Sequence, residues 1–215
     1  MKNKRKMIIS SIVILLPIVV GILFWDQLPE KIAVHWNAAG EANGWSNRIT
    51  AIFRMPLFIL LAHWICMLVT WKDAANKSQN SKVMDLLVWI CPFVSLVANG
   101  IVYATAFGIN LNISGVVFTF CGLLFMCIGN YLPKCKQNTT IGIKIKWTLL
   151  SEENWNATHR IAGKVWFVGG ALLLFSICIP EKYSFLLFIM LLSVMALIPI
   201  LYSSWYHKKE CGLIK

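Results

Sequence analysis

The sequence GNYLPKCKQNTTIGIKIKWTLLSEENWNATHRIAGKVW, residues 129–166, is the longest polar stretch of the chain, and long apolar runs flank it on both sides. Three tryptophans, Trp147, Trp155 and Trp166, stand among its charges. Its acids are Glu152 and Glu153, and its six cations are Lys134, Lys136, Lys144, Lys146, Arg160 and Lys164. Lysine and tryptophan together are typical of the boundary between lipid headgroups and water. A simple connector has no need of three tryptophans, so we expect this central stretch to be a specific folded element as well as an anchor.

The composition of the whole chain places it in a membrane. Of its 215 residues, 58% are apolar and only 13% are charged, and the mean hydropathy is +0.69. So few charges cannot cover the surface of a soluble protein, which means that the apolar excess faces lipid. The net charge of +11 lies in the loops, and no basic groove with aromatic stacking platforms is present. We therefore expect a lipid bilayer as a partner and no direct contact with nucleic acid.

Six apolar runs are long enough to cross a hydrocarbon core, which takes about 20 helical residues. They are residues 7–25, 53–71, 86–107, 113–132, 162–180 and 184–205. The predicted fold is an all-α membrane protein with six transmembrane helices and a small extracellular domain after the first. With the amino terminus in the cytoplasm, sixteen cations lie inside and four outside, so both termini are predicted to be cytoplasmic and the location to be the cell membrane.

The order of residues in the central stretch resembles the SdpI family of bacterial membrane immunity proteins. The residues that carry the resemblance are Gly129-Asn130, Pro133, Asn138, Ile141-Gly142, Trp147-Thr148-Leu149, Glu153, Trp155, Thr158-His159-Arg160 and Gly163-Lys164. Many members have an Arg-Thr-Pro triplet before the Trp-Thr pair, where this chain has Lys144-Ile145-Lys146. The charge is kept there and a proline turn is lost.

The outer loop, residues 26–54, has an LPE…HWNAAGE…GW pattern that resembles a small extracellular domain of unknown function, which often accompanies SdpI-type regions. We expect residues 31–36 to be extended, and Gly40, Asn43 and Gly44 to form turns. A metal site at His35 is disfavoured because no second histidine or cysteine lies nearby in the loop. The candidate residues of this loop are Pro29, Glu30, His35, Trp36, Gly40 and Trp45.

Local patterns predict more detail around the central stretch. Ser151 is a candidate cap for a helix over residues 151–180, and the alternation at 141–147 suits a short strand or an interfacial ribbon. Unpaired polar groups near a bilayer need partners, so we expect one buried cluster of Asn130, Asn138, Thr148 and Arg160. The loop 72–85 is expected to be a solvated connector. The full set of candidate functional residues here is Asn130, Asn138, Gly142, Trp147, Thr148, Glu153, Trp155, His159, Arg160 and Lys164.

Two further polar residues, His63 and Asn99, fall inside predicted membrane helices. An intramembrane titratable group is a functional hypothesis by default, and a packed neutral histidine and a proton relay stay equally open for His63. The expected domain organisation is 1–71 with the outer loop, 72–132 as a helical hairpin, and 129–206 as the SdpI-type region. The seven cysteines form no C-x-x-C pair, so neither a disulfide framework nor a zinc knuckle is expected.

The resemblance implies immunity to a secreted peptide toxin, with signalling through a cytosolic ArsR-type repressor held at the membrane. A transporter or channel using His63 and Asn99 is the first alternative, and a membrane enzyme acting around His159 and Arg160 is the second. The sequence has no G-x-S-x-G, H-E-x-x-H, P-loop or paired intramembrane aspartates. No catalytic residue, cofactor or metal is therefore expected, and the chain is predicted not to be an enzyme.

Overall fold

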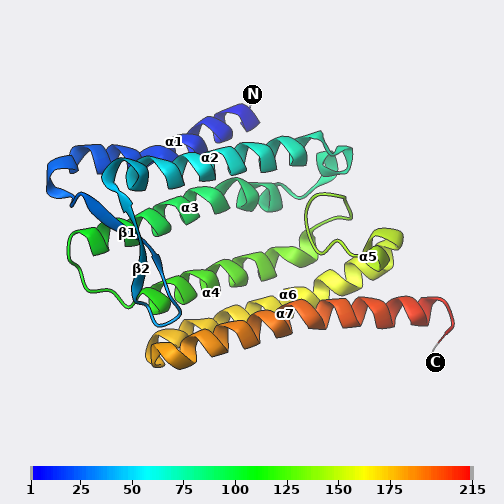
Figure 1. Cartoon of the computed structure of the whole chain (residues 1–215). Coiled ribbons are helices and arrows are strands. Elements are labelled where there is room, and N and C mark those ends of the chain that lie inside the picture. Colours follow the sequence, from blue (N-terminus) through cyan, green and yellow to red (C-terminus); the bar gives the residue numbers. More distant parts are fainter. Residues whose placement is uncertain (1, 214–215) are drawn as a thin grey trace. The chain divides into compact units, whose positions relative to one another are not determined.

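The computed structural model describes residues 2–213, without the side chains of residues 2, 3, 177, 181 and 182. Of the cations counted for orientation, Lys215 and the side chains of Lys2 and Lys182 lie outside the described residues. Figure 1 shows the elements in chain order. They are α1 (Lys2–Leu23), η1 (Trp25–Gln27), β1 (Lys31–Trp36), β2 (Ala42–Asn47), α2 (Arg48–Lys72), η2 (Ala74–Ser78), α3 (Ser81–Ala106), α4 (Ile113–Tyr131), η3 (Leu132–Lys134), α5 (Lys146–Leu150), α6 (Glu152–Leu174), η4 (Phe175–Cys178) and α7 (Glu181–Glu210).

Five of the described helical segments are long and apolar enough to cross a membrane, as expected for a multi-pass membrane protein. They are Lys4–Leu23, Arg48–Lys72, Ser81–Ala106, Ile113–Lys134 and Tyr183–Glu210. The predicted span 162–180 falls on α6 and η4, which are not among the five. Since α6 begins with four charged residues in its first four turns and contains a Gly169-Gly170 pair, its apolar part is short. The six-span count therefore stays a prediction.

The chain divides into two compact units, which are described separately. The first unit contains residues 1–67 and 85–117, and the second contains residues 68–84 and 118–215. In the first unit, α1, α2 and α3 run side by side, and the hairpin β1–β2 lies where α1 ends and α2 begins (Figure 1). In the second unit, α6 packs along both α4 and α7.

The core of the first unit joins the hairpin to three helices. Its buried residues are Leu28, Ile32, Ala51, Ile52, Val102 and Tyr103. Two hydrogen bonds fix α3 against α1: Tyr103 Oη donates to the carbonyl of Pro17 at 2.7 Å, and Ser95 Oγ donates to the carbonyl of Ile14 at 2.9 Å. Because these donors are buried in an apolar setting, leaving either without its acceptor costs about 1–3 kcal/mol.

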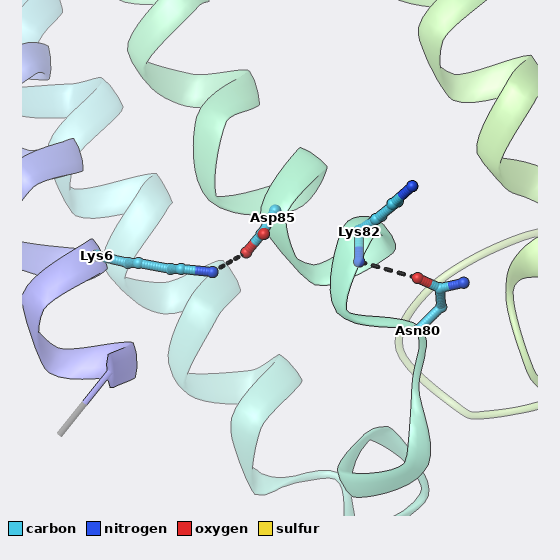
Figure 2. Close-up of polar contacts among 4 residues, drawn as sticks. All are labelled: Lys6, Asn80, Lys82 and Asp85. Atoms are coloured by element: carbon cyan, nitrogen blue, oxygen red, sulfur yellow. Dashed lines mark hydrogen bonds and ion pairs between the residues drawn. The ribbon is translucent and has the colours of Figure 1, made fainter.

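Polar contacts at the start of α3 are shown in Figure 2. Lys6 of α1 forms an ion pair with Asp85 of α3. One turn earlier, the side chain of Asn80 accepts the backbone N–H of Lys82 at 2.9 Å, which makes Asn80 the cap of α3. A capping side chain satisfies an N–H that has no partner inside the helix, and it fixes the residue at which α3 begins.

The extended segment predicted at 31–36 is confirmed as β1, but the predicted turn at Asn43 and Gly44 is wrong. Both residues belong to β2, which pairs antiparallel with β1. The turn lies earlier, where Asn37 Oδ1 accepts the N–H groups of Ala39 and Glu41 and Gly40 has φ of 76°. Gly44 serves packing instead, because a Cβ there would lie 2.9 Å from Cβ of His35.

Close packing of α4 on α6 organises the second unit. A Cβ at Gly122 would lie 2.6 Å from the carbonyl oxygen of Gly170, and one at Gly129 would lie 2.7 Å from that of Gly163. The two glycines of each helix are seven residues apart, so they recur on one face and let the backbones approach. This contact places the middle of α6 beside the end of α4, where the central stretch begins.

The crossing of α4 and α6 generates a stability prediction. Gly129→Ala should lower the free energy of unfolding by about 1–3 kcal/mol, because its new methyl group meets a backbone oxygen that cannot rotate away. The measurement is the thermal unfolding midpoint of the purified protein in detergent. The matched control is Gly100→Ala, another helical glycine, whose Cβ would meet no atom within 4 Å. Equal midpoints for the two variants would refute the close crossing.

Candidate functional site: the folded central stretch

Asn138 folds the first part of the central stretch back on itself. Its Oδ1 accepts the N–H groups of Thr140 at 2.8 Å and Ile141 at 2.6 Å. Its Nδ2 donates to the carbonyls of Lys136 at 2.8 Å and Ile141 at 2.9 Å. The side chain is only 3% exposed, so nearly all its hydrogen-bonding capacity is used inside the loop. Asn138 is therefore a structural organiser of this turn.

Gly142 and His159 meet directly behind that turn. Gly142 has φ of 103°, a conformation that favours glycine, and a Cβ at this position would lie 2.5 Å from Nε2 of His159. The imidazole Nε2 accepts the backbone N–H of Ile143 at 2.9 Å, and Nδ1 lies 2.8 Å from the carbonyl of Trp155. Nδ1 must therefore carry the proton, and the neutral ring bridges the loop to α6.

Burial keeps that ring neutral. Removal from water lowers the pKa of His159 to about 4, and the hydrogen bond to the Trp155 carbonyl opposes this shift only in part. The ring is 1% exposed and stacks on the indole of Trp155 with centroids 4.0 Å apart. A histidine of such low pKa is poorly suited to general acid–base catalysis near neutral pH. Its role in this arrangement is to accept a backbone N–H.

Of the two forms predicted for residues 141–147, a short strand or an interfacial ribbon, the strand does not form, although the residues alternate as a strand would. Residues 141–145 are irregular and lead into α5. Thr148, which is fully buried, accepts the N–H of Ile145 at 3.1 Å and lies 2.8 Å from the carbonyl of Ile143, to which its hydroxyl can donate. Side chains of Asn138, His159 and Thr148 thus take the backbone groups that a neighbouring strand would have paired.

Trp155 is the apolar centre of the central stretch. It is fully buried against Val83, Cys135, Tyr131 and Ile141. Its Nε1–H donates to the carbonyl of Cys135 at 2.8 Å, which satisfies the polar end of the indole. Burial raises the pKa of the Cys135 thiol to about 11, so this cysteine is a small packing group and not a thiolate nucleophile.

The cap predicted at Ser151 is confirmed, since its side chain accepts the N–H of Asn154 at 3.1 Å. In the first two turns of α6 lies a buried polar group, centred on Asn154, that sequence reasoning missed. Asn154 donates to the carbonyl of Ser203 at 2.9 Å and accepts from the hydroxyls of Ser203 at 2.6 Å and Thr158 at 3.0 Å. Asn154 and Thr158, at i and i+4 on one helix face, were the available signal. This group joins α6 to α7.

The loop after α2 is not the solvated connector that the sequence predicted. Asp73 accepts the hydroxyl and the N–H of Thr139 at 2.9 and 3.1 Å, and these hydrogen bonds lower its pKa. Asn76 donates to Thr140 Oγ1 at 2.6 Å, and Gln79 exchanges two hydrogen bonds with the backbone of Lys136. The loop therefore holds the central stretch on its other side. The two residues in each of these contacts are separated by 57 to 67 positions in the sequence. No local pattern reveals such contacts.

The cluster predicted from four polar residues does not form as one group. Asn138 and Thr148 are buried within the loop, whereas Asn130 and Arg160 are exposed. Glu153 and Lys164 are exposed as well, and Trp147 is half-buried. The predicted set therefore separates into an inner part that builds the fold and an outer part that is free to meet a partner.

The intramembrane histidine is hydrogen-bonded and packed. His63 is 1% exposed, and its Nε2 lies 2.9 Å from Ser10 Oγ. That hydroxyl donates to the carbonyl of Met7, so it accepts from Nε2–H of His63. Asn99, also 1% exposed, donates to the carbonyl of Ser95 at 2.8 Å. Neither geometry identifies a proton path.

The candidate residues of the segment 26–54 mostly stabilise the hairpin. His35 Nδ1 lies 2.6 Å from Asn43 Oδ1, which makes it a hydrogen-bonded histidine. The carbonyls of Pro29 and Glu30 accept from Nε and N of Arg48. Trp36 packs against the first-unit core and Gly40 occupies the turn. Trp45 is different, because it is 60% exposed.

The neutrality of His159 makes stability sensitive to acid. Because its folded pKa lies below the unfolded value of about 6.5, the unfolded chain binds more protons between pH 6.5 and 4. The contribution of the neutral His159 ring to the free energy of unfolding is complete above pH 6.5. It is lost as the pH falls toward 4, by about 1.4 kcal/mol per pH unit. Thermal midpoints measured across this range should fall more steeply for the wild type than for His159→Gln. Equal slopes would contradict the buried neutral ring.

Comparisons with known proteins cover both halves of the chain. Residues 134–203 match the family model described as SdpI/YfhL protein family, and residues 12–60 match that described as Domain of unknown function (DUF1648). Immunity protein SdpI of Bacillus subtilis (strain 168) is 28% identical over 212 residues, which are 97% of this chain and 99% of that protein. No solved structure matches the chain significantly. The first match begins in the central stretch, and the second includes the hairpin.

Proposed function

We propose that this chain, whose residues 134–203 match the SdpI/YfhL protein family model, is an integral membrane immunity protein that protects its cell from a secreted peptide toxin. The observation that carries this proposal is the similarity to Immunity protein SdpI along 97% of the chain. A likeness of that extent includes the hairpin, the helices and the central stretch together. It supports a shared task for the whole molecule and not only a shared anchor.

The central stretch supplies the proposal with a surface of defined shape. Its inner residues, Asn138, Thr148, Trp155 and His159, hold the backbone rigid, while Trp147 and Arg160 remain partly or fully accessible. The side chain of Arg160 has no hydrogen bond or ion pair within the described residues. In the proposed arrangement the accessible surface that contains Trp147 and Arg160 faces the cytoplasm. It docks an ArsR-type repressor when toxin is present. No enzymatic step is included, because the one buried histidine of the stretch is held neutral.

The proposed topology has six spans, with both termini in the cytoplasm and α6 as the fifth span. It follows from the excess of cations in the segments assigned to the inside. Alkaline phosphatase, which is active only outside the cytoplasm, can be fused after residues 40, 78, 110, 142 and 182. Fusions after 40, 110 and 182 should be active, and those after 78 and 142 inactive. An inactive fusion after 182 would mean that α6 does not cross.

The immunity proposal is tested by survival of a toxin-sensitive bacterium that expresses this chain. Cells challenged with a cannibalism-type peptide should survive at least about tenfold better than empty-vector cells, and Arg160→Ala or Trp147→Ala should remove most of that protection. Lys208→Ala is the matched control, because it removes an exposed cation of α7 outside the central stretch. Membrane levels are equalised by quantitative blotting. The tenfold threshold corresponds to about 1.4 kcal/mol if protection follows toxin binding.

Three outcomes of this assay have separate meanings. Full protection by both Arg160→Ala and Trp147→Ala would reduce the central stretch to a membrane anchor. Protection without any movement of a co-expressed ArsR-type repressor to the membrane fraction would leave immunity and remove signalling. No protection despite correct insertion would contradict the proposal and favour the alternative of transport through His63 and Asn99.

A further inference from the structure

A pocket of about 300 Å³ lies in the first unit between the hairpin and the helices α2 and α3. It is lined by Val34, Ser46, Thr50, Ala51, Arg54, Met55, Phe58, Asn99 and Val102. Most of these side chains are apolar, and a few polar groups are placed among them. A concave apolar site with a small number of convergent polar groups is the usual form of a ligand-binding pocket.

The local structure explains why these residues converge. Thr50, Arg54 and Phe58 are four residues apart and lie on one face of α2, while Asn99 and Val102 share a face of α3. Val34 is the unpaired residue of a bulge in β1, between Ala33 and His35. A bulge redirects a side chain out of the strand alternation, and here it turns Val34 toward the helices.

Two polar groups of the lining have no partner. Asn99 is 1% exposed, and its Oδ1 makes no hydrogen bond within the described residues. A buried unpaired acceptor is costly, so a ligand that brings a donor would relieve it. Arg54 is exposed, and its guanidinium makes no hydrogen bond or ion pair in the described part of the chain. No acidic residue lines the pocket, so the free charge there is positive.

Arg54 and Asn99 lie at similar distances from the helix ends beside the hairpin. Arg54 lies six residues after the start of α2, and Asn99 lies seven residues before the end of α3. At 1.5 Å per helical residue both are roughly 10 Å from the helix ends beside the hairpin. A ligand that enters from the hairpin end would therefore meet the cation, the apolar wall and the unpaired amide oxygen within one short segment.

We propose that this pocket binds the carboxyl-terminal residues of an apolar peptide. The terminal carboxylate pairs with the guanidinium of Arg54, which suits bidentate recognition. An apolar side chain packs against Met55, Phe58 and Val102, and a peptide N–H donates to Oδ1 of Asn99. A fatty acid offers the carboxylate and the apolar chain but has no N–H donor, so a peptide satisfies all three features of the pocket.

The proposal deepens the proposed function, because it identifies the part of a secreted peptide that the outer side of the protein would recognise. It rests on that function only for the biological role of the peptide. Binding itself depends on the pocket alone, and the two can fail separately.

Titration calorimetry on the full chain in phosphatidylcholine nanodiscs tests the binding, with titrations into empty nanodiscs subtracted. The probes are N-acetyl-Val-Leu as the free acid, the same dipeptide as its carboxamide, and decanoate. The wild type should bind the free acid at least about tenfold more tightly than the carboxamide, the effect of one lost charge pair. Arg54→Gln should abolish that preference, and Asn99→Ala should weaken both dipeptides alike.

Lys31→Gln is the matched control, because it removes an exposed cation of β1 that does not line the pocket. It should keep the full preference for the free acid. The proposal is overturned by equal binding of acid and carboxamide to the wild type, by an unchanged preference in Arg54→Gln, or by no binding at millimolar concentration. Decanoate that binds as tightly as the free acid would instead assign the pocket to a fatty acid.

The survival assay separates the pocket from the wider function. If the wild type protects cells and Arg54→Gln protects them equally well, immunity stands and the pocket is not where the toxin is recognised. If no toxin is resisted but the dipeptide preference is observed, the pocket stands and the immunity function falls.

Discussion

The backbone of residues 138–148 is largely irregular, so its N–H and C=O groups cannot rely on a helix or a strand. Side chains take their place, because a buried peptide group without a partner is costly. Asn138 closes the turn, His159 receives the N–H of Ile143, and Thr148 caps the step into α5. The neutral imidazole is the key member of this set, because it is the one of the three side chains that comes from α6 and so hydrogen-bonds the loop to that helix. The shape of the central stretch depends on these few hydrogen bonds.

Glycines, which have no side chain, position the helices α4 and α6 that flank the central stretch. Gly122 and Gly129 on α4 meet Gly170 and Gly163 on α6 so closely that a Cβ would strike a backbone oxygen. Inside a membrane, apolar side chains gain little by leaving lipid for each other, and close backbone packing provides the association instead. The crossing brings the end of α4 next to the middle of α6. Trp155 then packs against a fixed apolar surface, and Ile141 of the central stretch covers it.

The same residues have unequal roles in the proposed function. Asn138, Thr148, Trp155 and His159 are buried and would act on a partner only through the shape that they maintain. Arg160, Lys164 and Asn130 are exposed, so they can be changed without opening the core. In the first unit the division is similar. The hairpin is held by buried Leu28 and Ile32, while Arg54 and Asn99 keep unused hydrogen-bonding capacity inside a pocket.

The sequence by itself determined the membrane character, the positions of five apolar helices, the cap at Ser151 and the strand 31–36, because hydropathy and capping act over a few neighbouring residues. It also pointed to Gly142, Trp155 and His159 through a family resemblance. Only the tertiary structure decided that 141–145 is not a strand, that Asp73 holds Thr139, and that Asn130 and Arg160 stay outside the buried group. These outcomes depend on hydrogen bonds and packing between residues far apart in the chain. Local periodicity carries no information about which distant side chain forms a hydrogen bond with a given backbone atom.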